Sequence, residues 1–209
     1  MDNTYIKTHD YTARIIMLGD CCVGKTSFTY KINNKNNLNF VYDPTIGVDY
    51  SSKMIHLKDD TTVKCQIWDT AGQIKFISII RTYFKNISGI IVLFDLSKRK
   101  TFENLKIWFR EIKENKNNYP ISVMIIGNKL DIKNRQISID EARRFAEENN
   151  AMYMEMSVKT GKNVDKVLKL LCEDIYKHKE TNRGFKKIEG IKITQKKKVN
   201  DKLDCCCCF

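Results

Sequence analysis

The chain of 209 residues has only two prolines and nine glycines, and its apolar share of 42% is ordinary for a globular protein. This composition excludes a collagen-like or wholly disordered chain. Its longest apolar runs, such as residues 90–94, fall far short of the roughly 20 residues that a membrane-spanning helix needs. Residues 1–4 have neither the basic nor the apolar region of a secretory signal. These absences predict a soluble intracellular protein of one or two domains, whose membrane attachment, if any, uses other means.

The eight cysteines are even in number but are not placed as a disulfide framework. Cys21 and Cys22 are adjacent, Cys65 and Cys172 lie in apolar segments, and residues 205–208 form an unbroken block. Adjacent cysteines rarely bridge each other, and a chain of this length can build a core without cross-links. The cysteines lack zinc-finger spacing, and the three histidines are scattered, which indicates ordinary structural positions for the histidines.

The positive charge is concentrated near the C-terminus. Residues 177–204 contain ten Lys and Arg residues but four Asp and Glu residues, and so hold half of the net charge of +12. The few apolar residues of this segment cannot form a core, which is typical of a flexible basic tail. We therefore predict a flexible N-terminal extension over residues 1–12, a folded domain over 13–177 and a basic tail over 178–209.

Apolar periodicity switches between short strand-like and longer helix-like segments. The predicted strands cover residues 13–18, 49–57, 62–68, 89–96, 121–127 and 152–156. The predicted helices cover residues 25–34, 73–84, 101–115, 139–149 and 164–176. Ser138 is the expected N-cap of the fourth helix, with Glu141 three residues later. The pattern predicts an α/β fold with a mainly parallel six-stranded sheet, one antiparallel edge strand in a hairpin, and about five helices on both faces. Ligands bind such sheets at the carboxyl ends of the strands.

The first chemical signal is the segment GDCCVGKT at residues 19–26, which matches the pattern G-x4-G-K-[ST] between a predicted strand and a predicted helix. The main-chain N–H groups of such a loop cradle phosphates, aided by the positive end of the following helix. Lys25 would neutralise the β- and γ-phosphates, and the Thr26 hydroxyl would coordinate Mg²⁺. A chance glycine-rich turn is the alternative. The strand–loop–helix context favours a sheet of the P-loop NTPase type.

The second signal is the segment WDTAGQ at residues 68–73, which follows a predicted strand. Asp69 can hold Mg²⁺ through water, as an acidic residue does in P-loop enzymes. Gly72 lets a main-chain N–H approach a γ-phosphate closely, and Gln73 would orient an attacking water. Taken alone, an Asp followed by a Gly three residues later is also a common turn.

The third and fourth signals, NKLD at residues 128–131 and SVK at 157–159, predict the choice of base. The carboxylate of a buried Asp131 accepts from both N1–H and the exocyclic amine of guanine, and it rejects adenine because unpaired buried polar groups are costly. Asn128 can bind the base edge and tie loops together, while the stem of Lys129 can pack on the purine. A main-chain N–H of residues 157–159 would meet guanine O6. The four signals in this order predict a guanine nucleotide site.

On these motifs, residues 14–176 resemble the Ras superfamily of small GTPases and, within it, the Rab family of vesicle-traffic regulators. Residues 46–49, 66–68 and 154–157 are further Rab-like segments. Residues 43–50 look like the first switch region, so the resemblance implies that Thr45 binds Mg²⁺ and the γ-phosphate. The implied metal ligands are Thr26, Thr45 and Asp69, and the implied catalytic residues are Gln73, Lys25 and Thr45. The implied nucleotide contacts are Asp20, Cys21, Cys22, Val23, Gly24, Lys25, Thr26, Ser27, Leu38, Tyr42, Thr45, Asp69, Gly72, Asn128, Lys129, Asp131, Ser157, Val158 and Lys159.

Two assignments that the resemblance implies stay open. Leu38 stands where an aromatic residue usually stacks on guanine, and Phe40 is the alternative if the loop shifts. Tyr50, Trp68 and Tyr83 correspond to an aromatic cluster read by effectors, although they can equally be ordinary strand and core aromatics.

The resemblance implies a switch that cycles between GTP and GDP. Thr45 and Gly72 would contact the γ-phosphate, order both switches and release them after hydrolysis. No arginine obviously acts in cis, so a GTPase-activating protein is implied. The other implied partners are an exchange factor, effectors at the switch regions, a Rab escort protein and a GDP-dissociation inhibitor. We expect a monomer that does not bind nucleic acid, because the folded part lacks a basic patch interleaved with aromatics.

Besides Leu38, the departures from the Rab pattern are Cys21, Cys22 and the segment at residues 74–77. Cys21 occupies a position where side chains larger than Gly obstruct hydrolysis in Ras itself, and Cys22 also differs from the usual small residue. Ile74 replaces the Glu that usually follows the switch glutamine, which changes the surface seen by partners. We therefore expect slow intrinsic turnover, and the alternative is a GTP-bound, poorly hydrolysing scaffold of the same fold. The guanine signals and the lack of a lid-like insertion disfavour a P-loop kinase or ATPase.

The chain ends in four cysteines and Phe209. Read as a C-a-a-X sequence, this end predicts a geranylgeranyl group on Cys206. The Rab resemblance instead implies two such groups on the pair Cys205 and Cys206, and the sequence leaves both routes open. A metal-binding or accidental cysteine tract is the alternative. Two lipid chains, or one chain with basic residues, make attachment stable. We expect the cytoplasmic face of an intracellular membrane compartment, with a cytosolic pool.

Overall fold

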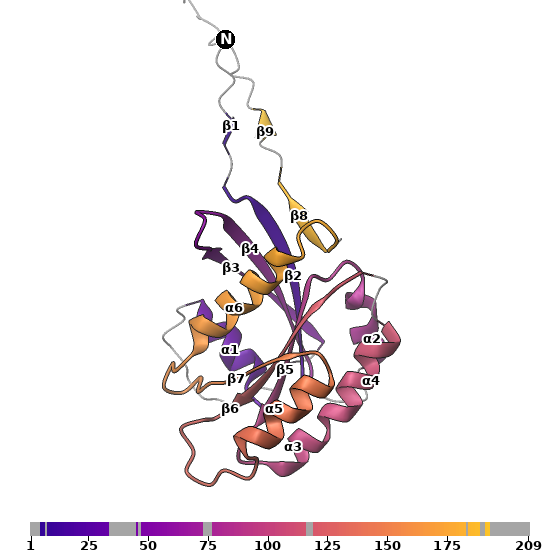
Figure 1. Ribbon diagram of the computed structural model, residues 1–209, viewed down its shortest axis with the longest axis vertical. Helices are drawn as coiled ribbons and strands as arrows, with labels where there is room; N and C mark the ends of the chain where they lie inside the picture. Colours follow the sequence, from indigo (N-terminus) through magenta and orange to yellow (C-terminus); the bar gives the residue numbers. More distant parts are fainter. Residues whose placement is uncertain are drawn as a thin grey trace, which may run out of the picture.

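The computed structural model describes residues 5–6, 8–33, 45, 47–72, 77–115, 119–182, 184–188 and 191–192. A twisted sheet with helices on both faces forms its body (Figure 1). The strands are β2 (Tyr11–Leu18), β3 (Val48–His56), β4 (Thr62–Thr70), β5 (Gly89–Asp95), β6 (Ser122–Asn128) and β7 (Met152–Glu155). They lie in the order β3-β4-β2-β5-β6-β7. The helices are α1 (Lys25–Ile32), α2 (Ile77–Arg81), η2 (Thr82–Phe84), α3 (Arg99–Glu103), α4 (Leu105–Asn115), α5 (Ile139–Glu148) and α6 (Val164–Lys177).

The strand directions confirm the predicted fold class. β2 pairs in parallel with β4 and β5, and β6 pairs in parallel with β5 and β7. β3 is the antiparallel edge strand, and its register with β4 runs from Val48 opposite Thr70 to His56 opposite Thr62. A short turn closes this hairpin, in which Leu57 N donates to Thr61 O at 2.9 Å. The fold is therefore a P-loop type α/β sheet with one edge hairpin.

The sheet separates two apolar cores, and successive side chains along a strand enter them alternately. On β2, the side chains of Ile15 and Met17 enter one core and those of Ile16 and Leu18 enter the other. The first core is covered by α1 and α6, and the second by α2, α3, α4 and α5 (Figure 1). All seven residues of β5 are buried, as expected for a central strand of a parallel sheet covered on both faces.

Two predicted helices differ in the structure. The predicted helix over residues 73–84 begins at Ile77 and continues as the 3-10 helix η2, while residues 73–76 lie outside the described part. The predicted helix over 101–115 is two helices, α3 and α4, which meet at Asn104. The capping prediction for α5 is confirmed, because the N–H of Glu141 donates to Ser138 Oγ at 3.1 Å.

The region after α6 departs from the prediction of a flexible tail from residue 178. Strand β8 (Phe185–Lys187) pairs antiparallel with β2 at residues 11–13, directly beyond the stretch of β2 that pairs with β5. Phe185 is buried and stacks on Tyr11 with ring centroids 4.7 Å apart. Residues 185–187 therefore differ from the predicted flexible tail, because they pair with β2, the Phe185 ring packs on Tyr11, and Ile188 N donates to Asp10 O at 2.8 Å.

The N-terminal prediction also changes at its end. β2 begins at Tyr11, two residues before the predicted strand, and Thr62 N donates to the Asp10 carboxylate at 2.7 Å. Strands β1 (Tyr5–Ile6) and β9 (Ile191–Lys192) form a separate antiparallel pair, so the two terminal segments lie side by side (Figure 1). Among the described residues, no helix combines the length and the apolar character needed to cross a membrane.

The packing of Phe185 leads to a stability prediction. We expect Phe185→Ala to lower the free energy of unfolding by about 3 kcal/mol, since a buried aromatic ring and its contacts are lost. Lys186→Ala, at the exposed neighbouring position, is the control and should change this free energy by less than about 0.5 kcal/mol. Urea unfolding followed by circular dichroism measures both. A Phe185→Ala effect as small as that of the control would contradict the packing role of Phe185.

Candidate nucleotide-binding site

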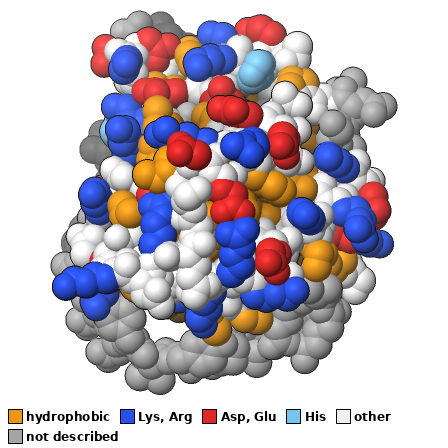
Figure 2. Space-filling model, turned by 60° about the horizontal axis from the view of Figure 1, so that its bottom comes forward, with side chains coloured by type: hydrophobic (Ala, Val, Ile, Leu, Met, Phe, Trp, Pro, Cys, Tyr) orange, Lys and Arg blue, Asp and Glu red, His pale blue; other side chains and the backbone are white. Residues whose placement is uncertain are grey.

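The candidate site lies where four strands end at the same edge of the sheet. The loops that follow β2, β4, β6 and β7 carry the four motifs of the sequence. Parallel strands bring their carboxyl ends together, so segments more than 130 residues apart in the chain meet here. Figure 2 faces this end of the molecule, on which Lys and Arg side chains are interspersed with Asp and Glu side chains.

The loop between β2 and α1 has a main-chain path that needs its glycines. Gly19 and Gly24 have φ values of 132° and 100°, which L side chains rarely adopt. A Cβ atom at Gly19 would lie 2.3 Å from Leu93 O, and one at Gly24 would lie 2.3 Å from Asn128 Nδ2. Cys22 also has a positive φ, of 63°. This loop, residues 19–24 (the phosphate loop), therefore lies close against β5 and the last residue of β6.

Lys25 is buried at the first position of α1, with 5% of its surface exposed. Its Nζ donates to Gly19 O and to Asp20 O, each at 2.8 Å, and so spans the inside of the loop. Burial lowers the pKa of Lys25, while the negative charge of Asp69 opposes this shift. A cation held in this way, beneath a loop of main-chain N–H groups, suits the binding of phosphate.

Three oxygen-bearing side chains converge next to Lys25. Thr26 Oγ1 donates to Asp69 Oδ2 at 2.5 Å and lies 2.7 Å from Thr45 Oγ1. Asp69 is 1% exposed, and its Oδ1 has no hydrogen-bond partner among the described residues. Burial raises the pKa of Asp69, against the hydrogen bond from Thr26 and the charge of Lys25. A buried unpaired carboxylate oxygen beside two hydroxyls fits a hard divalent cation such as Mg²⁺.

Asn128 joins two of the loops. Its Nδ2 donates to Val23 O at 2.8 Å, and its Oδ1 accepts from Val158 N at 3.2 Å. The side chain is buried at the end of β6. The phosphate loop and the loop after β7 are thus held at a set separation by a single amide group.

Asp131 differs from the sequence interpretation in its burial. It is exposed in the protein alone, and its Oδ1 accepts from Ser157 Oγ at 2.5 Å. Ser157 is buried and also accepts from Thr160 N at 3.1 Å. The Ser157 hydroxyl therefore orients the carboxylate, and the desolvation invoked to exclude adenine has to come from the bound base.

Lys129 has a partner that the sequence analysis missed. Its Nζ lies 2.6 Å from Oδ2 of Asp95, a buried carboxylate at the end of β5. Burial by itself would raise the pKa of Asp95, but hydrogen bonds from Lys129 and Ser97 outweigh it and hold this pKa below its ordinary value. The sequence did hold one indication of this role, because Asp95 ends a predicted strand at the same edge of the sheet as the four motifs.

The other predicted site residues have varied positions. Gly72 lies against the phosphate loop, where an added Cβ would be 2.5 Å from both the Asp20 main chain and Lys25 Nζ. Val23 is buried, Cys21 and Ser27 are half-buried, and Cys22 and Lys159 are exposed. The predicted residues that lie outside the described part are Leu38, Phe40, Tyr42, Gln73, Ile74, Cys205 and Cys206.

The three aromatic residues that the resemblance assigns to an effector surface differ in their exposure. Tyr50 is 50% exposed and meets Trp68 edge-on at 5.4 Å between ring centroids. The Arg14 guanidinium lies 4.6 Å from the centre of the Trp68 ring. Tyr83, by contrast, packs against the second core. Trp68 also packs against this core, so Tyr50 is the exposed member of a pair whose partner, like Tyr83, is half-buried.

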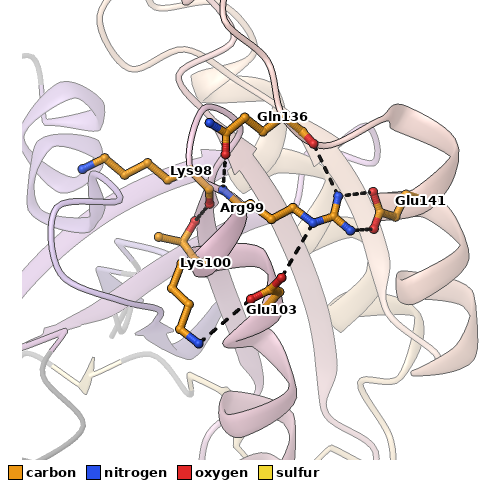
Figure 3. A network of polar contacts seen from close by, with 7 residues as sticks. Lys98, Arg99, Lys100, Glu103, Gln136 and Glu141 are labelled. Carbon is orange, nitrogen blue, oxygen red and sulfur yellow. Dashed lines mark hydrogen bonds and ion pairs between the residues drawn. The ribbon is translucent and has the colours of Figure 1, made fainter.

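A polar network supports the base side of the site (Figure 3). Arg99, the first residue of α3, donates from its main chain to Gln136 Oε1 at 2.8 Å and from its guanidinium to both carboxylate oxygens of Glu141. Glu103 lies 3.9 Å from the same guanidinium. The network ties the loop after Asp131 to α3 and α5, and sequence motifs gave no sign of it.

The Asp95–Lys129 pair makes a pH-dependent prediction. We expect Asp95→Asn to lower the free energy of unfolding by about 2 kcal/mol at neutral pH, because charge-assisted hydrogen bonds to a buried carboxylate are lost. The depressed pKa of Asp95 means that its contribution is complete above the unfolded value near pH 4 and is lost as the pH falls through the folded value. Urea unfolding from pH 7 down to pH 3 measures the difference from wild type. A difference that does not shrink at low pH would contradict the assignment.

Comparison with known proteins agrees with this geometry. Residues 14–177 match the model of the Ras family. Rab-2B of Dictyostelium discoideum is 37% identical over 187 residues, which cover 88% of this chain and 90% of the relative. Rab11B of Nicotiana tabacum is 34% identical over 81% of this chain and 77% of its own length, and Rab-39A of Mus musculus is 35% identical over 79% and 78%. With the phosphate loop, the buried Asp69 and the motif after β6 all at one edge of the sheet, the chain belongs to the Ras family of small GTPases and is Rab-like.

Proposed function

We propose that this protein is a Rab-like molecular switch that binds and hydrolyses GTP and recruits effectors in vesicle traffic. The observation that carries the proposal is the meeting of Lys25, the Thr26–Asp69 pair and the 128–131 segment at one edge of the sheet. Together these groups supply a cation for phosphate, oxygen ligands for a metal and an oriented carboxylate for a base.

The phosphate end of the proposed site uses Lys25, Thr26, Thr45 and Asp69. Lys25 offers a buried ammonium group that is already oriented by two loop carbonyls. Thr26, Thr45 and Asp69 would hold Mg²⁺, with Asp69 acting directly or through water. When bound, Mg²⁺ neutralises charge on the β- and γ-phosphate oxygens. Thr45 belongs to the predicted first switch region, residues 43–50, so its contact with Thr26 gives that switch a link to the phosphates.

The base end of the proposed site uses Asp131 and its supports. The carboxylate accepts from Ser157 through Oδ1, and a carboxylate has lone pairs on both oxygens for the donors of guanine. Adenine presents no such pair of donors and would leave the carboxylate poorly solvated. Asn128 holds the loop that follows β7 against the phosphate loop, so base and phosphate contacts are set at a fixed distance.

Hydrolysis in this proposal depends on Gln73, Lys25 and Thr45. Gln73 orients the attacking water, Lys25 stabilises the charge that develops on the phosphate oxygens, and Thr45 positions the γ-phosphate. Cys21, half-buried in the phosphate loop, narrows the space for that water and for an arginine from an activating partner. A slow intrinsic rate, raised by a GTPase-activating protein, is the expected behaviour.

The remaining parts of the proposal concern partners and membranes. The exposed Tyr50 beside Trp68 offers a surface for effectors, and exchange factors and activating proteins act on the switches. The cysteine block, prenylated on Cys206 alone or on both Cys205 and Cys206, anchors the chain to the cytoplasmic face of an internal membrane, and escort and dissociation-inhibitor proteins bind the lipid. In this scheme the folded domain predicted over residues 13–177 is extended by the start of β2 at Tyr11 and by the docked strand β8, and the basic tail follows.

The base assignment is tested with Asp131→Ala. We expect this substitution to weaken GDP binding about 100-fold, because two hydrogen bonds to a charged group are lost. Asp140→Ala, an exposed acidic residue of α5, is the control and should leave the affinity unchanged. Competition of GDP and ADP against a fluorescent GDP measures both affinity and selectivity. Equal affinity of the wild-type protein for the two nucleotides would overturn the guanine assignment.

The catalytic assignment is tested by single-turnover hydrolysis. Wild-type protein loaded with GTP is expected to release phosphate at about 10⁻⁴ to 10⁻³ s⁻¹. Gln73→Leu should reduce this rate by roughly tenfold or more, because the attacking water is no longer oriented. Gln66→Leu on β4 is the matched control, with no expected change. If wild-type protein releases no phosphate even with an activating partner, the alternative of a GTP-bound scaffold replaces the hydrolase.

A further inference from the structure

The side chain of Asp20, in the phosphate loop, is held from outside that loop. Asn104 Nδ2 donates to Asp20 Oδ2 at 2.6 Å, and Trp108 Nε1 donates to Asp20 Oδ1 at 2.9 Å. Asn104 joins α3 to α4, and Trp108 lies in the first turn of α4. Both carboxylate oxygens of a phosphate-loop residue are therefore bound by the start of one helix.

The main chain of the same residue faces the phosphate side. Asp20 O accepts from Lys25 Nζ at 2.8 Å. Gly72 lies so close on the other side that an added Cβ would be 2.5 Å from Asp20 C and Asp20 O. The Asp20 peptide thus has Lys25 and Gly72 on its inner side and α4 on its outer side. Because the bonds to α4 restrain where the Asp20 Cα can lie, a shift of this main chain away from α4 would also move the carbonyl that holds Lys25.

The outer anchor is rigid because Trp108 is part of the second core. The ring is 1% exposed and belongs to the same cluster as Leu105 and Phe109 of α4. An indole N–H is a donor without any acceptor function, and leaving it unpaired inside the protein carries a desolvation cost. The Trp108 N–H therefore keeps the Asp20 carboxylate in one place, and Asn104 fixes the second oxygen.

From this geometry we propose that Asp20 is a positioning residue which, through Asn104 and Trp108, anchors the phosphate loop to α4 and so slows the release of bound nucleotide. This inference rests on the proposed function, since it concerns retention of the nucleotide that Lys25 and Gly72 contact. The start of α4 would then be connected to the bound nucleotide through the Asp20 side chain and the Lys25 ammonium group.

The test measures the dissociation rate of a fluorescent GDP from Mg²⁺-loaded, full-length protein. Trp108→Phe keeps the buried ring and removes the N–H, and Asn104→Ala removes the second donor. Each is expected to speed dissociation about fivefold to tenfold, and Asp20→Ala about tenfold or more. Asp20→Asn still accepts the indole N–H and, with a flipped Asn104 amide, keeps both bonds, so its rate should stay within about threefold of wild type.

A double-mutant cycle separates positioning from general stability. If Asp20 and Trp108 act as one unit, the Asp20→Ala/Trp108→Phe protein dissociates GDP no faster than Asp20→Ala alone. Phe109→Leu is the matched control, because Phe109 lies on the same helix and in the same core, where its ring meets that of Phe145. It should lower the melting temperature and leave the dissociation rate unchanged.

The outcomes distinguish this inference from the proposed function. If the wild-type protein binds no guanine nucleotide, the proposed function fails. If it binds GDP but Trp108→Phe and Asp20→Ala release it at the wild-type rate, the positioning role fails and the proposed function stands. Additive effects in the double mutant, or a rate for Asp20→Asn as fast as for Asp20→Ala, would also overturn the positioning role.

Discussion

The buried ammonium group of Lys25 is the charge on which the arrangement of the site depends. Its two main-chain partners, Gly19 O and Asp20 O, make the phosphate loop close around a cation, and burial lowers its pKa while Asp69 opposes the shift. An ammonium group with so little water around it favours a polyanion as a further partner. The close approach of Gly72 and the contact of Thr26 with Asp69 follow from the same crowding around one charge.

The two cores determine how firmly this charge is placed. α1 and α6 cover one face of the sheet, and the larger group of helices with Trp108 covers the other. Elements packed in these cores present side chains to the site. Trp108 of the second core donates to Asp20, and Asn128 at the end of β6 bonds to two loops. Val23 and Val158 of these loops are themselves buried in the first core, so the loops are held by the packed elements behind them.

The sequence predicted which residues come together at the site better than it predicted the residues that hold them in place. Lys25, Thr26 and Asp69 could be assigned because their spacing to a strand and a glycine has a chemical meaning. Asp95, Asn104 and Trp108 could not, because their roles arise from partners that lie 34, 84 and 88 residues away in the chain. The burial of Asp131 was misjudged for a related reason, since the solvent exposure of a loop depends on everything packed around it.

The amino-acid sequence by itself determined the alternation of strands and helices, the hairpin and the identity of the four motifs, because hydrophobic period and glycine spacing are local properties. Only the tertiary structure decided that residues 185–187 dock on β2 and that α4 holds Asp20. These features depend on which edge of a strand stays open and on which side chain of a distant helix reaches it, as for Phe185 on Tyr11 and Trp108 on Asp20. Local periodicity carries no information on such pairings, since they are selected by the free energy of the whole packed chain.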